Sequence, residues 1–506
     1  MLLPSLVIIP FIGGILCCLS GFLNFKIPRF IALLTTISIL LVSVQLWKET
    51  NYSIIQPLNI TQWQLHFCLQ WIPRFGINFN LALDGISLLM LMLTGLLGIL
   101  SVLCEWNENK KYQGFFYLNL MWIIGGIIGV LLSIDMFLFF FFWEIMLIPM
   151  CFLISFWGNE ASTTKIRVNA ATKFFIYTQI SGLFMLVAII GLAFTYYQST
   201  GVWNFNYEQL LKTSMSHNIE YILMLGIFIA FAIKLPIVPF HGWLLDTQSQ
   251  TSNSGSIDLV GILIKTSVYG LIRFSIPLFP NVLSEFAPIE ICLGIISIFY
   301  GAWMAFSQTD IKRLIAFSSI SHMGFIMIAI ANHSELAIQG AIIQTISHSI
   351  SSAALIILFG QLYKRTNTRD ITKMAGLWSK INWIPGLSLF FMAANLGLPG
   401  TGNFIGEFLI LTGSFKTAPI SVIIATFGLV FSSIYSLVMI YRIYYGTSYL
   451  DGILLKISFN EFVTISILAV LLVLLGMYPQ PILDTSFVPI HNIQKWLAIS
   501  VPTTRL

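Results

Sequence analysis

Charged residues are scarce in this chain. Only 9% of its 506 residues are Asp, Glu, Lys or Arg, against about 25% in soluble domains. A globule of this length has to cover its surface with charge, so the sequence excludes a soluble enzyme. It also excludes a disordered chain, because 57% of the residues are hydrophobic. The net charge of +5 is too small to indicate a nucleic-acid partner.

Cysteine motifs and nucleotide-binding loops are missing as well. The chain has six cysteines, but none of them forms a C-x-x-C pair or the spacing of a zinc site. It contains no Walker loop and no G-x-G-x-x-G fingerprint. The sequence therefore predicts that the chain itself holds no metal, iron–sulfur cluster, haem, nucleotide or flavin, and it excludes a disulfide scaffold.

Long apolar runs are what the sequence has in abundance. The mean hydropathy is +0.88, and about 20 apolar residues suffice for a helix to cross the bilayer hydrocarbon. The runs are continuous and do not alternate, which disfavours a β-barrel. We predict an all-α polytopic membrane protein with about fourteen transmembrane helices, the first a retained helix and not a signal peptide. The helices are expected near residues 2–24, 28–48, 82–104, 113–132, 135–155, 169–197, 219–245, 257–279, 286–306, 311–332, 335–362, 382–413, 418–446 and 457–478.

Basic residues set the expected orientation. If both termini lie outside, most of the 25 Lys and Arg residues fall in the inward loops, as the positive-inside rule requires. Lys173 and Arg273 lie near the ends of predicted helices, where long side chains can reach the membrane surface. Lys234 and Lys265 fall near the midplane of neighbouring helices and cannot easily do so.

Six ionisable residues stand inside otherwise apolar helices. A charge at a helix centre costs about 2.5–3.5 kcal/mol on insertion scales, and such residues typically mark an ion or proton path. A structural pair or a satisfied polar core is the competing explanation for any one of them, above all for either histidine. Six on successive helices favour proton transfer, with Lys234 holding or releasing a proton according to whether Glu144 is close and ionised. The six residues are Glu144, Lys234, Lys265, His322, His348 and Glu407.

Two of the predicted helices are expected to be broken. Pro236 and Pro239 follow Lys234 in the seventh helix, and the glycine-rich run 397–402 precedes Glu407 in the twelfth. Interrupted helices in two halves of a chain are typical of inverted-repeat transporters, although ordinary proline kinks would also produce them. We predict that helices 4–8 and 9–13 form two inverted five-helix repeats. The predicted divisions are 1–112 (helices 1–3), 113–280 (first repeat), 281–446 (second repeat) and 447–506 (helix 14 and a tail).

Five segments resemble the antiporter-like membrane subunits of respiratory complex I. They read FFFFWEIMLIPM, KLPIVPFHGWLLD, LIKTSVYG, TDIKRLIAFSSISHMGF and LGLPGTGNFIGEF. The resemblance covers essentially the whole chain, and it is closest to the member type with a glutamate on the broken twelfth helix, where its siblings have a lysine. One stretch departs from the family pattern: after His241-Gly242-Trp243-Leu244 the family usually reads P-D-A-H. This chain has Leu245, Asp246, Thr247 and Gln248 there, which puts in doubt a role for a histidine in that loop.

The resemblance implies a set of roles for the six residues. Glu144 and Lys234 match the buried pair of the proton-input half, whereas Lys265, His322 and His348 match the central relay. Glu407 matches the residue that leads to the outward exit. These roles are those of a proton-translocating subunit of NADH:quinone oxidoreductase that carries no redox site itself.

The resemblance also implies partners and a location. The partners would be L-type and N-type antiporter-like subunits, small membrane subunits and lipid. NADH, FMN, iron–sulfur clusters and quinone would belong to partner subunits. The location would be the bacterial inner membrane, crossed many times, with both termini on the periplasmic side. The alternatives are a subunit of a Mrp-type cation/proton antiporter, which shares these helices, and a non-pumping scaffold or solute carrier.

Overall fold

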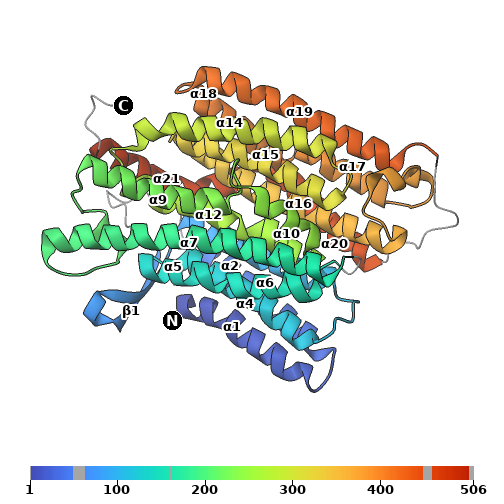
Figure 1. Cartoon of the computed structure of the whole chain (residues 1–506), viewed down its shortest axis with the longest axis horizontal. Coiled ribbons are helices and arrows are strands. Elements are labelled where there is room, and N and C mark those ends of the chain that lie inside the picture. The colour runs from blue at the N-terminus through green and yellow to red at the C-terminus, as the bar shows by residue number, and fades with distance from the viewer. Residues whose placement is uncertain (1, 50–62, 160–161, 448–458, 501–506) are drawn as a thin grey trace.

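The computed structural model describes residues 2–49, 63–159, 162–447 and 459–500. Within these residues the chain is mostly helical, and the long helices lie side by side in one bundle (Figure 1). Twelve helices of the described chain are long and apolar enough to cross a membrane, or thirteen if one bent pair counts as a single span. This confirms the predicted all-α polytopic membrane fold, and each of the fourteen predicted ranges contains a helix or a broken helix.

The first half of the chain carries a β-hairpin among its helices. The elements are α1 (Leu2–Gly21), α2 (Ile27–Glu49), β1 (Leu65–Ile72), β2 (Ile77–Leu83), α3 (Gly85–Cys104), α4 (Gln113–Leu132), α5 (Met136–Ile145), α6 (Leu147–Trp157), α7 (Thr164–Thr200), α8 (Tyr207–Leu210), α9 (His217–Lys234) and α10 (Gly242–Gln250).

The eighth predicted span is a composite helix, and the remaining helices follow it. The elements are α11 (Asn253–Asp258), the π-helix η2 (Leu259–Leu263), α12 (Lys265–Gly270), the π-helix η3 (Leu271–Ser275), α13 (Ile276–Leu278), α14 (Leu283–Ser307), α15 (Ile311–Ala331), α16 (Glu335–Thr366), α17 (Ile384–Asn395), α18 (Gly402–Phe415), α19 (Pro419–Tyr444), α20 (Phe459–Met477) and α21 (Gln480–Ser500).

Aspartates begin several of the buried helices. Asp84 accepts a hydrogen bond from the Ser87 amide at the start of α3, and the Ser87 hydroxyl accepts one from the Asp84 amide in return. Asp135 and Asp310 cap α5 and α15 in the same manner with their side-chain oxygens. The first amides of a helix have no partner within the helix, so each cap satisfies donors that would otherwise be unpaired in an apolar surrounding.

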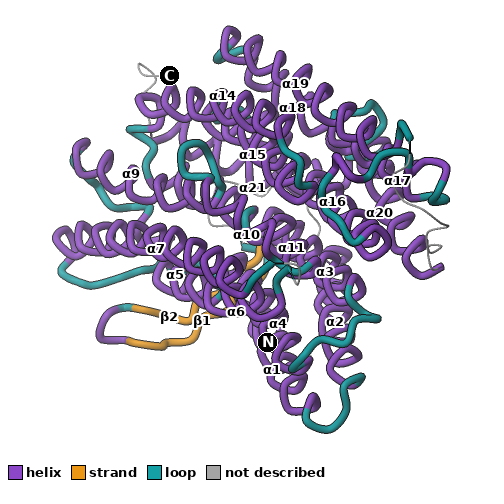
Figure 2. The backbone as a smooth tube through the Cα atoms, turned by 45° about the vertical axis from the view of Figure 1, so that its right-hand side comes forward, coloured by secondary structure: helices purple, strands orange, loops and turns teal. Residues whose placement is uncertain are grey.

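The hairpin of β1 and β2 was not predicted. It lies in the polar gap between the second and third predicted helices and projects beside the bundle (Figure 2). Gly76 turns the chain with a φ of +67°, a conformation that glycine adopts without strain. The Asn78 amide then donates to Asp135 at 3.0 Å, which attaches the hairpin to the start of α5. We call this end of the bundle the hairpin end.

The predicted breaks in the seventh and twelfth helices are confirmed. The helix α9 ends at Lys234, and the chain turns through Pro236 before α10 begins. The helix α17 is separated from α18 by a turn in which Gly397 and Gly400 both have positive φ. Whether the two halves are inverted repeats stays a prediction.

A further helix follows the fourteenth predicted span. The predicted tail contains α21, which is bent by 64° relative to α20 and lies at the hairpin end (Figure 1). Trp47 at the end of α2 donates to Thr485 at 2.9 Å, and Trp496 donates to the Pro277 carbonyl at 3.0 Å. The helix α21 therefore ties α2 and α13 together across the bundle. Polar residues along α21 lower its hydropathy, which is why the search for apolar runs did not find it.

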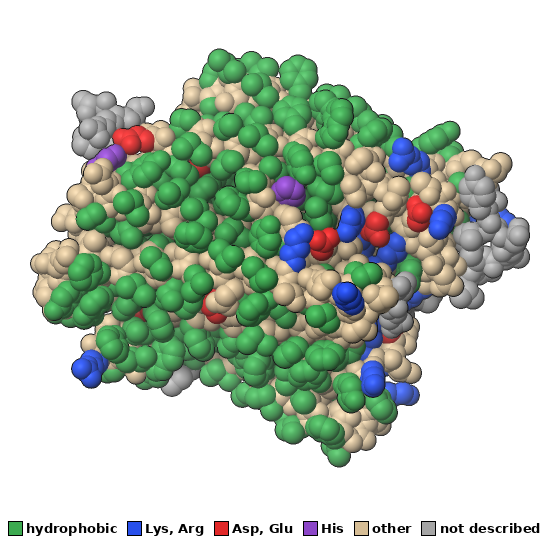
Figure 3. Space-filling model, viewed as in Figure 1, with side chains coloured by type: hydrophobic (Ala, Val, Ile, Leu, Met, Phe, Trp, Pro, Cys, Tyr) green, Lys and Arg blue, Asp and Glu red, His purple; other side chains and the backbone are tan. Residues whose placement is uncertain are grey.

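The surface divides into an apolar band and a basic end. Figure 3 shows hydrophobic side chains over α7, α9 and α14, whereas Lys and Arg gather at the opposite end from the hairpin. We call this second end the basic end and define it by Lys110, Lys364 and Arg369. Lys110 and Lys364 both bind Glu108 there, at 2.6 and 2.7 Å. An apolar band between polar ends is the surface expected of a chain surrounded by lipid.

Candidate functional site

Five of the six predicted site residues lie deep inside the bundle. Their side chains expose 3% or less of their surface, and they come from α9, α12, α15, α16 and α18. The sixth, Glu144 on α5, is half-buried. The five buried residues are Lys234, Lys265, His322, His348 and Glu407. None of them points into lipid, so the cost of placing an ionisable group in a membrane is met inside the protein.

Glu407 contacts hydrogen-bonding side chains from two neighbouring helices. His322 Nδ1 lies 3.0 Å from Glu407 Oε1, and Gln344 Nε2 donates to the same oxygen at 3.1 Å. Gln344 also lies 3.4 Å from His322 Nδ1. Three helices, α15, α16 and α18, therefore meet at one carboxylate oxygen. Gln344 was not predicted, although it stands one helical turn before His348, on a helix whose buried surface is unusually rich in Ser, Thr and Gln.

Lys265, His348 and His322 form a row of contacts that ends at Glu407. Lys265 Nζ lies 3.2 Å from His348 Nδ1 and 3.1 Å from Met323 Sδ. The rings of His348 and His322 are adjacent, with centroids 5.0 Å apart. The structure thus joins Lys265, His348, His322 and Glu407 in one row across α12, α16, α15 and α18. These are the central and exit residues of the predicted relay.

Glu144 and Lys234 are not in direct contact. The Lys234 ammonium lies over the ring of Trp143, 3.4 Å from its centroid, where a cation–π interaction takes the place of an ion pair. Glu144 Oε1 is buried and accepts no hydrogen bond within the described chain. Beside Lys234 is a cavity of about 10 Å³, lined also by Trp143 and Thr178. A volume near this size accommodates about one water molecule.

The breaks in the seventh and twelfth predicted helices position Lys234 and Glu407. Lys234 is the last residue of α9, where the carbonyl end of the helix dipole favours a cation. Trp243 of α10 donates to the freed Ile233 carbonyl at 2.8 Å, so the broken backbone stays satisfied. In the second break, a Cβ on Gly397 would come within 2.8 Å of Glu407 Oε2. Glycine at this position leaves space for the carboxylate.

The expectation that Arg273 reaches the membrane surface is wrong. Its side chain is buried, with Nε 3.4 Å from Asp84 Oδ2 and the guanidinium 4.1 Å above the Trp63 ring. Lys173 is partly exposed and binds Asp246 at 2.7 Å. An arginine near a helix end can pair inward or extend outward, and the apolar run around it does not distinguish the two.

The stretch that departs from the family pattern keeps two ionic contacts, both through Asp246. Asp246 binds Arg313 at 2.9 Å in addition to Lys173. Gln248 occupies the position where the family usually has histidine. It is fully buried, and neither its amide oxygen nor its amide nitrogen has a hydrogen-bond partner in the described chain. Asp246 therefore retains a structural role, whereas Gln248 contributes no titratable group.

Sequence reasoning also missed three buried charged residues close to the basic end: Glu105, Asp258 and Lys312. Each lies next to a helix terminus and among serines or polar residues, so none interrupts an apolar run. No group of three or more His, Cys, Asp or Glu side chains suited to a metal ion occurs in residues 2–49, 63–159, 162–447 or 459–500.

Comparisons with known proteins place the chain in a family and match its fold. Residues 133–432 match the model of the family described as NADH:quinone oxidoreductase/Mrp antiporter, TM. NADH-quinone oxidoreductase subunit M of Escherichia coli strain K12 is 61% identical over 508 residues, covering 100% of both chains. A chain of respiratory complex I from Thermus thermophilus with bound NADH is 26% identical, with a TM-score of 0.84 over 97% of this chain and 100% of that one.

A second solved structure has the same fold. A chain of the Mrp complex from Dietzia sp. DQ12-45-1b matches with a TM-score of 0.84 over 98% of this chain and 100% of that one, at 18% identity. At this identity the match shows the shared fold alone. The fold by itself thus does not separate a complex I subunit from a Mrp-type subunit.

Proposed function

Because the chain belongs to the family of NADH:quinone oxidoreductase and Mrp antiporter membrane subunits, we propose that it is a proton-translocating subunit of the membrane arm of respiratory complex I. The observation that carries this proposal is the row of contacts from Lys265 through His348 and His322 to Glu407. Each member of the row can gain or lose a proton, and each lies away from lipid. A row of this kind transfers protons without a metal or a cofactor in the chain.

The two histidines have the form that a proton relay requires. In each ring Nδ1 faces a titratable partner, whereas Nε2 has no hydrogen-bond partner in the described chain. An imidazole can accept a proton at one nitrogen and release it from the other. We take His348 to receive the proton from Lys265, and His322 to deliver it to Glu407. A water molecule or a ring rotation has to bridge the two rings.

Glu407 is proposed as the last residue before the exit. Two donors hold its Oε1, and its Oε2 faces the turn at Gly397 where α17 and α18 are separated. Irregular backbone at membrane depth occurs where it borders protein or a watery cavity. Release through this break toward the hairpin end would place the exit on the periplasmic side, with both termini on that side.

Glu144 and Lys234 are proposed as the input pair. In this structure the two side chains are not in direct contact, and the Lys234 ammonium lies over the Trp143 ring. If Glu144 moves toward Lys234 in its ionised form, it favours the protonated amine; when it withdraws, the amine releases the proton. The small cavity beside Lys234 provides space for about one water molecule, which could bridge the two groups.

The proposal implies partner subunits, cofactors in those partners and a cellular location. The partners would be the other subunits of complex I, among them L-type and N-type antiporter-like subunits and small membrane subunits, together with lipid. NADH, FMN, iron–sulfur clusters and quinone would be bound by those partners. The compartment would be the bacterial inner membrane. Helices 4–8 and 9–13 would be the two inverted repeats that carry the input half and the exit half.

A Mrp-type antiporter subunit is the second candidate. It is favoured only by the shared fold, at 18% identity. The full-length match at 61% identity is to a subunit of NADH-quinone oxidoreductase, and this supports complex I over the antiporter.

Co-purification tests the assembly, and one substitution tests the relay. Extraction in mild detergent should bring flavin- and iron–sulfur-containing polypeptides out with this chain. In inverted membrane vesicles, Lys265→Ala should abolish NADH-driven acidification, whereas Lys173→Ala, the control outside the relay, should not. Full acidification with Lys265→Ala would refute the proposal. Isolation without redox subunits, together with cation-dependent proton exchange, would support the antiporter.

A further inference from the structure

Asp258 is a buried acid with no assigned role. It is the last residue of α11 and is 0% exposed; Ser101 is a hydrogen-bonding neighbour, but within the described chain neither carboxyl oxygen has a hydrogen bond of normal length and angle. A carboxyl group in this situation is unfavourable as an anion, and buried polar groups without a partner are uncommon in folded proteins. The group therefore requires either a proton or a water molecule, and both requirements point to a role in proton transfer.

Glu105 connects Asp258 to the basic end. Glu105 follows the last residue of α3, and it pairs with Ser254, which lies one helical turn before Asp258 on α11. Its Oε1 accepts a hydrogen bond from the Ser254 amide at 3.2 Å, at the start of α11. Lys110 lies 3.5 Å from its Oε2. Two carboxyl groups, one near the basic end and one deeper, thus follow each other along α11.

Lys312 approaches the same segment from α15. Its Nζ donates to the Thr251 carbonyl at 2.7 Å and to the Ser256 hydroxyl at 3.2 Å. Glu105, Lys312 and Asp258 form what we call the α11 cluster. Its members come from three different helices, and each exposes 4% or less of its surface. Neither the input pair nor the relay includes any of them.

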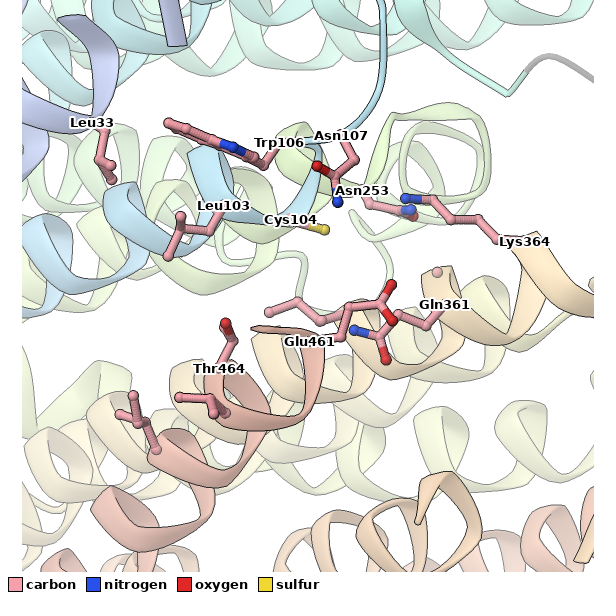
Figure 4. Close-up of a pocket in the computed structure, with 14 residues that line it drawn as sticks. Leu33, Leu103, Cys104, Trp106, Asn107, Asn253, Gln361, Lys364, Glu461 and Thr464 are labelled. Carbon is pink, nitrogen blue, oxygen red and sulfur yellow. The ribbon is translucent and has the colours of Figure 1, made fainter. Parts of the chain in front are cut away.

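A cavity at the basic end reaches the start of α11, next to this cluster. It has a volume of about 500 Å³ and lies between α3 on one side and α16 and α20 on the other (Figure 4). Asn253, the first residue of α11, lines it next to Gly360 and Lys364. A second cavity of about 10 Å³ shares Asn253 and Gly360 with the first and reaches Lys312. The two cavities together bring space for water to the start of α11.

Lys265 lies directly beyond Asp258 along the same composite helix. Seven residues separate them, about 10 Å at 1.5 Å per residue. The intervening segment is the π-helix η2, a distortion that is frequent at functional sites. Lys265 in turn contacts His348 at the start of the relay. Lys234, by contrast, lies beside the small cavity and the Trp143 ring.

We propose that Asp258 is a second proton inlet, which receives protons through the large cavity and the α11 cluster and passes them to Lys265. Each pumping cycle needs this inlet as well as the Glu144–Lys234 pair, so closing either one stops pumping. This inference rests on the proposed proton-translocating function. In each transfer a hydronium ion in the cavity protonates the Asp258 carboxylate and becomes water. The O–H bond of Asp258 then breaks as a bridging water accepts the proton, and an N–H bond forms on the neutral Lys265 amine as the last water gives it up. Glu105 and Lys312 hold the start of α11 and set the charge around the path, as positioning residues.

Substitutions at Asp258 test the inlet in the assembled complex. Asp258→Asn should lower NADH-driven acidification of inverted vesicles by about tenfold or more, with the amount of assembled complex unchanged. Asp258→Glu should retain most of the acidification, because it keeps a titratable group. Glu290→Gln is the matched control, since Glu290 is a buried carboxyl on α14 outside the α11 cluster. Asp258→Asn with full acidification would overturn the proposal.

Chemical rescue separates proton transfer from a structural role. Asp258→Ala leaves space for a small carboxylic acid, so added formate should restore acidification by about threefold or more over the unrescued variant. Formate should have no effect on Lys265→Ala, which lacks the proton acceptor. Failure of formate with Asp258→Ala, in a complex that assembles normally, would mean that Asp258 acts only in packing.

Thiol labelling tests separately whether the large cavity is open to the basic end. In a Cys104→Ser background, Asn253→Cys places a thiol in the large cavity. A membrane-impermeant thiol reagent should block acidification when added to the cytoplasmic side and should have no effect from the periplasmic side. Blocking from neither side would overturn the inlet. The proposed function itself would fall only if Lys265→Ala also pumped fully, so the two failures are distinguishable.

Discussion

His322 Nδ1 lies 3.0 Å from Glu407 Oε1, although 85 residues separate them in the chain. The contact joins α15 to α18, the second part of the broken twelfth predicted helix. Both side chains are almost fully buried, so the pair is shielded from water and a proton shared between them stays within the protein. Gln344 binds the same oxygen and orients the carboxylate. The pair is the last step of the proposed relay, and it gives the first prediction.

Glu407→Gln should stop proton release. The amide keeps the shape of the side chain and its contact with His322, but it cannot carry a proton at neutral pH. We expect NADH-driven acidification of inverted vesicles to fall by about tenfold or more, with normal assembly. Glu335→Gln, on the first turn of α16 near His491, is the control that should change neither property. Normal acidification with Glu407→Gln would contradict its role as the last residue of the relay.

His348→Ala should lower pumping only in part. Removing the ring leaves a cavity that water can occupy between Lys265 and His322, and water can carry the proton more slowly. The second measurement is the double variant with His322→Ala. Since the two rings act in series, the double variant should pump about as slowly as the slower single variant. Effects that simply multiply would show that the histidines act independently.

Lys234→Ala should abolish or strongly reduce coupled turnover, because no other titratable nitrogen is placed to serve Glu144. Lys234→Arg is the more informative variant. A guanidinium preserves a cation over the Trp143 ring, but it does not release its proton under biological conditions. If proton release matters, Arg should be as inactive as Ala in NADH-driven acidification. Activity with Arg would mean that Lys234 only supplies a positive charge.

Gly397→Ala should destabilise the protein and impair the exit. At a φ of +77° a side chain is strained by about 1–3 kcal/mol, and the new Cβ would crowd Glu407 Oε2. Gly386→Ala is a matched control, because Gly386 lies in the helix α17 with open space around it. That change should be neutral or slightly stabilising. The two variants are compared by thermal unfolding of the purified complex, with the loss of this subunit from the complex as the signal. Equal midpoints would contradict the prediction.

Asp135 should make stability depend on pH. Burial raises the pKa of this carboxyl to about 6, although the amides of Asn78, Leu138 and Phe137 hold it lower than burial alone would. A folded-state pKa above the unfolded value means that the native state binds the proton more tightly. The contribution is therefore present at low pH and is lost as the pH rises toward 6 and beyond.

Asp135→Asn removes this dependence while it keeps a good helix cap. Relative to the unmodified protein, the variant should gain thermal stability between pH 4 and pH 7. The measurement is the difference between the two unfolding midpoints across that range. A difference that stays constant with pH would show that Asp135 does not titrate there.

Much of the membrane topology was predictable because it depends on short segments. The length of an apolar run decides whether a helix can cross the bilayer, and the breaks after Lys234 and before Glu407 are marked by proline and glycine. The six relay candidates were visible because a charge or a histidine is conspicuous in an apolar run. Asp258 and Lys312 were not visible, since each sits near a helix end among polar neighbours.

Other features depend on contacts that no local pattern reports. Arg273 turned inward to Asp84 because the hairpin places Trp63 over its guanidinium. The helix α21 gains its place from tryptophan contacts to distant helices, not from its own hydropathy.

By itself, the sequence determined that this chain is a bundle of membrane helices with titratable residues in its interior, because hydropathy and helix-breaking residues act locally. Only the tertiary structure decided which of those residues meet. Lys265 contacts His348, 83 residues away, whereas Lys234 rests on Trp143 and not on Glu144. Such pairing depends on how each helix is rotated against its neighbours, and that rotation is set by the packing of all their side chains together.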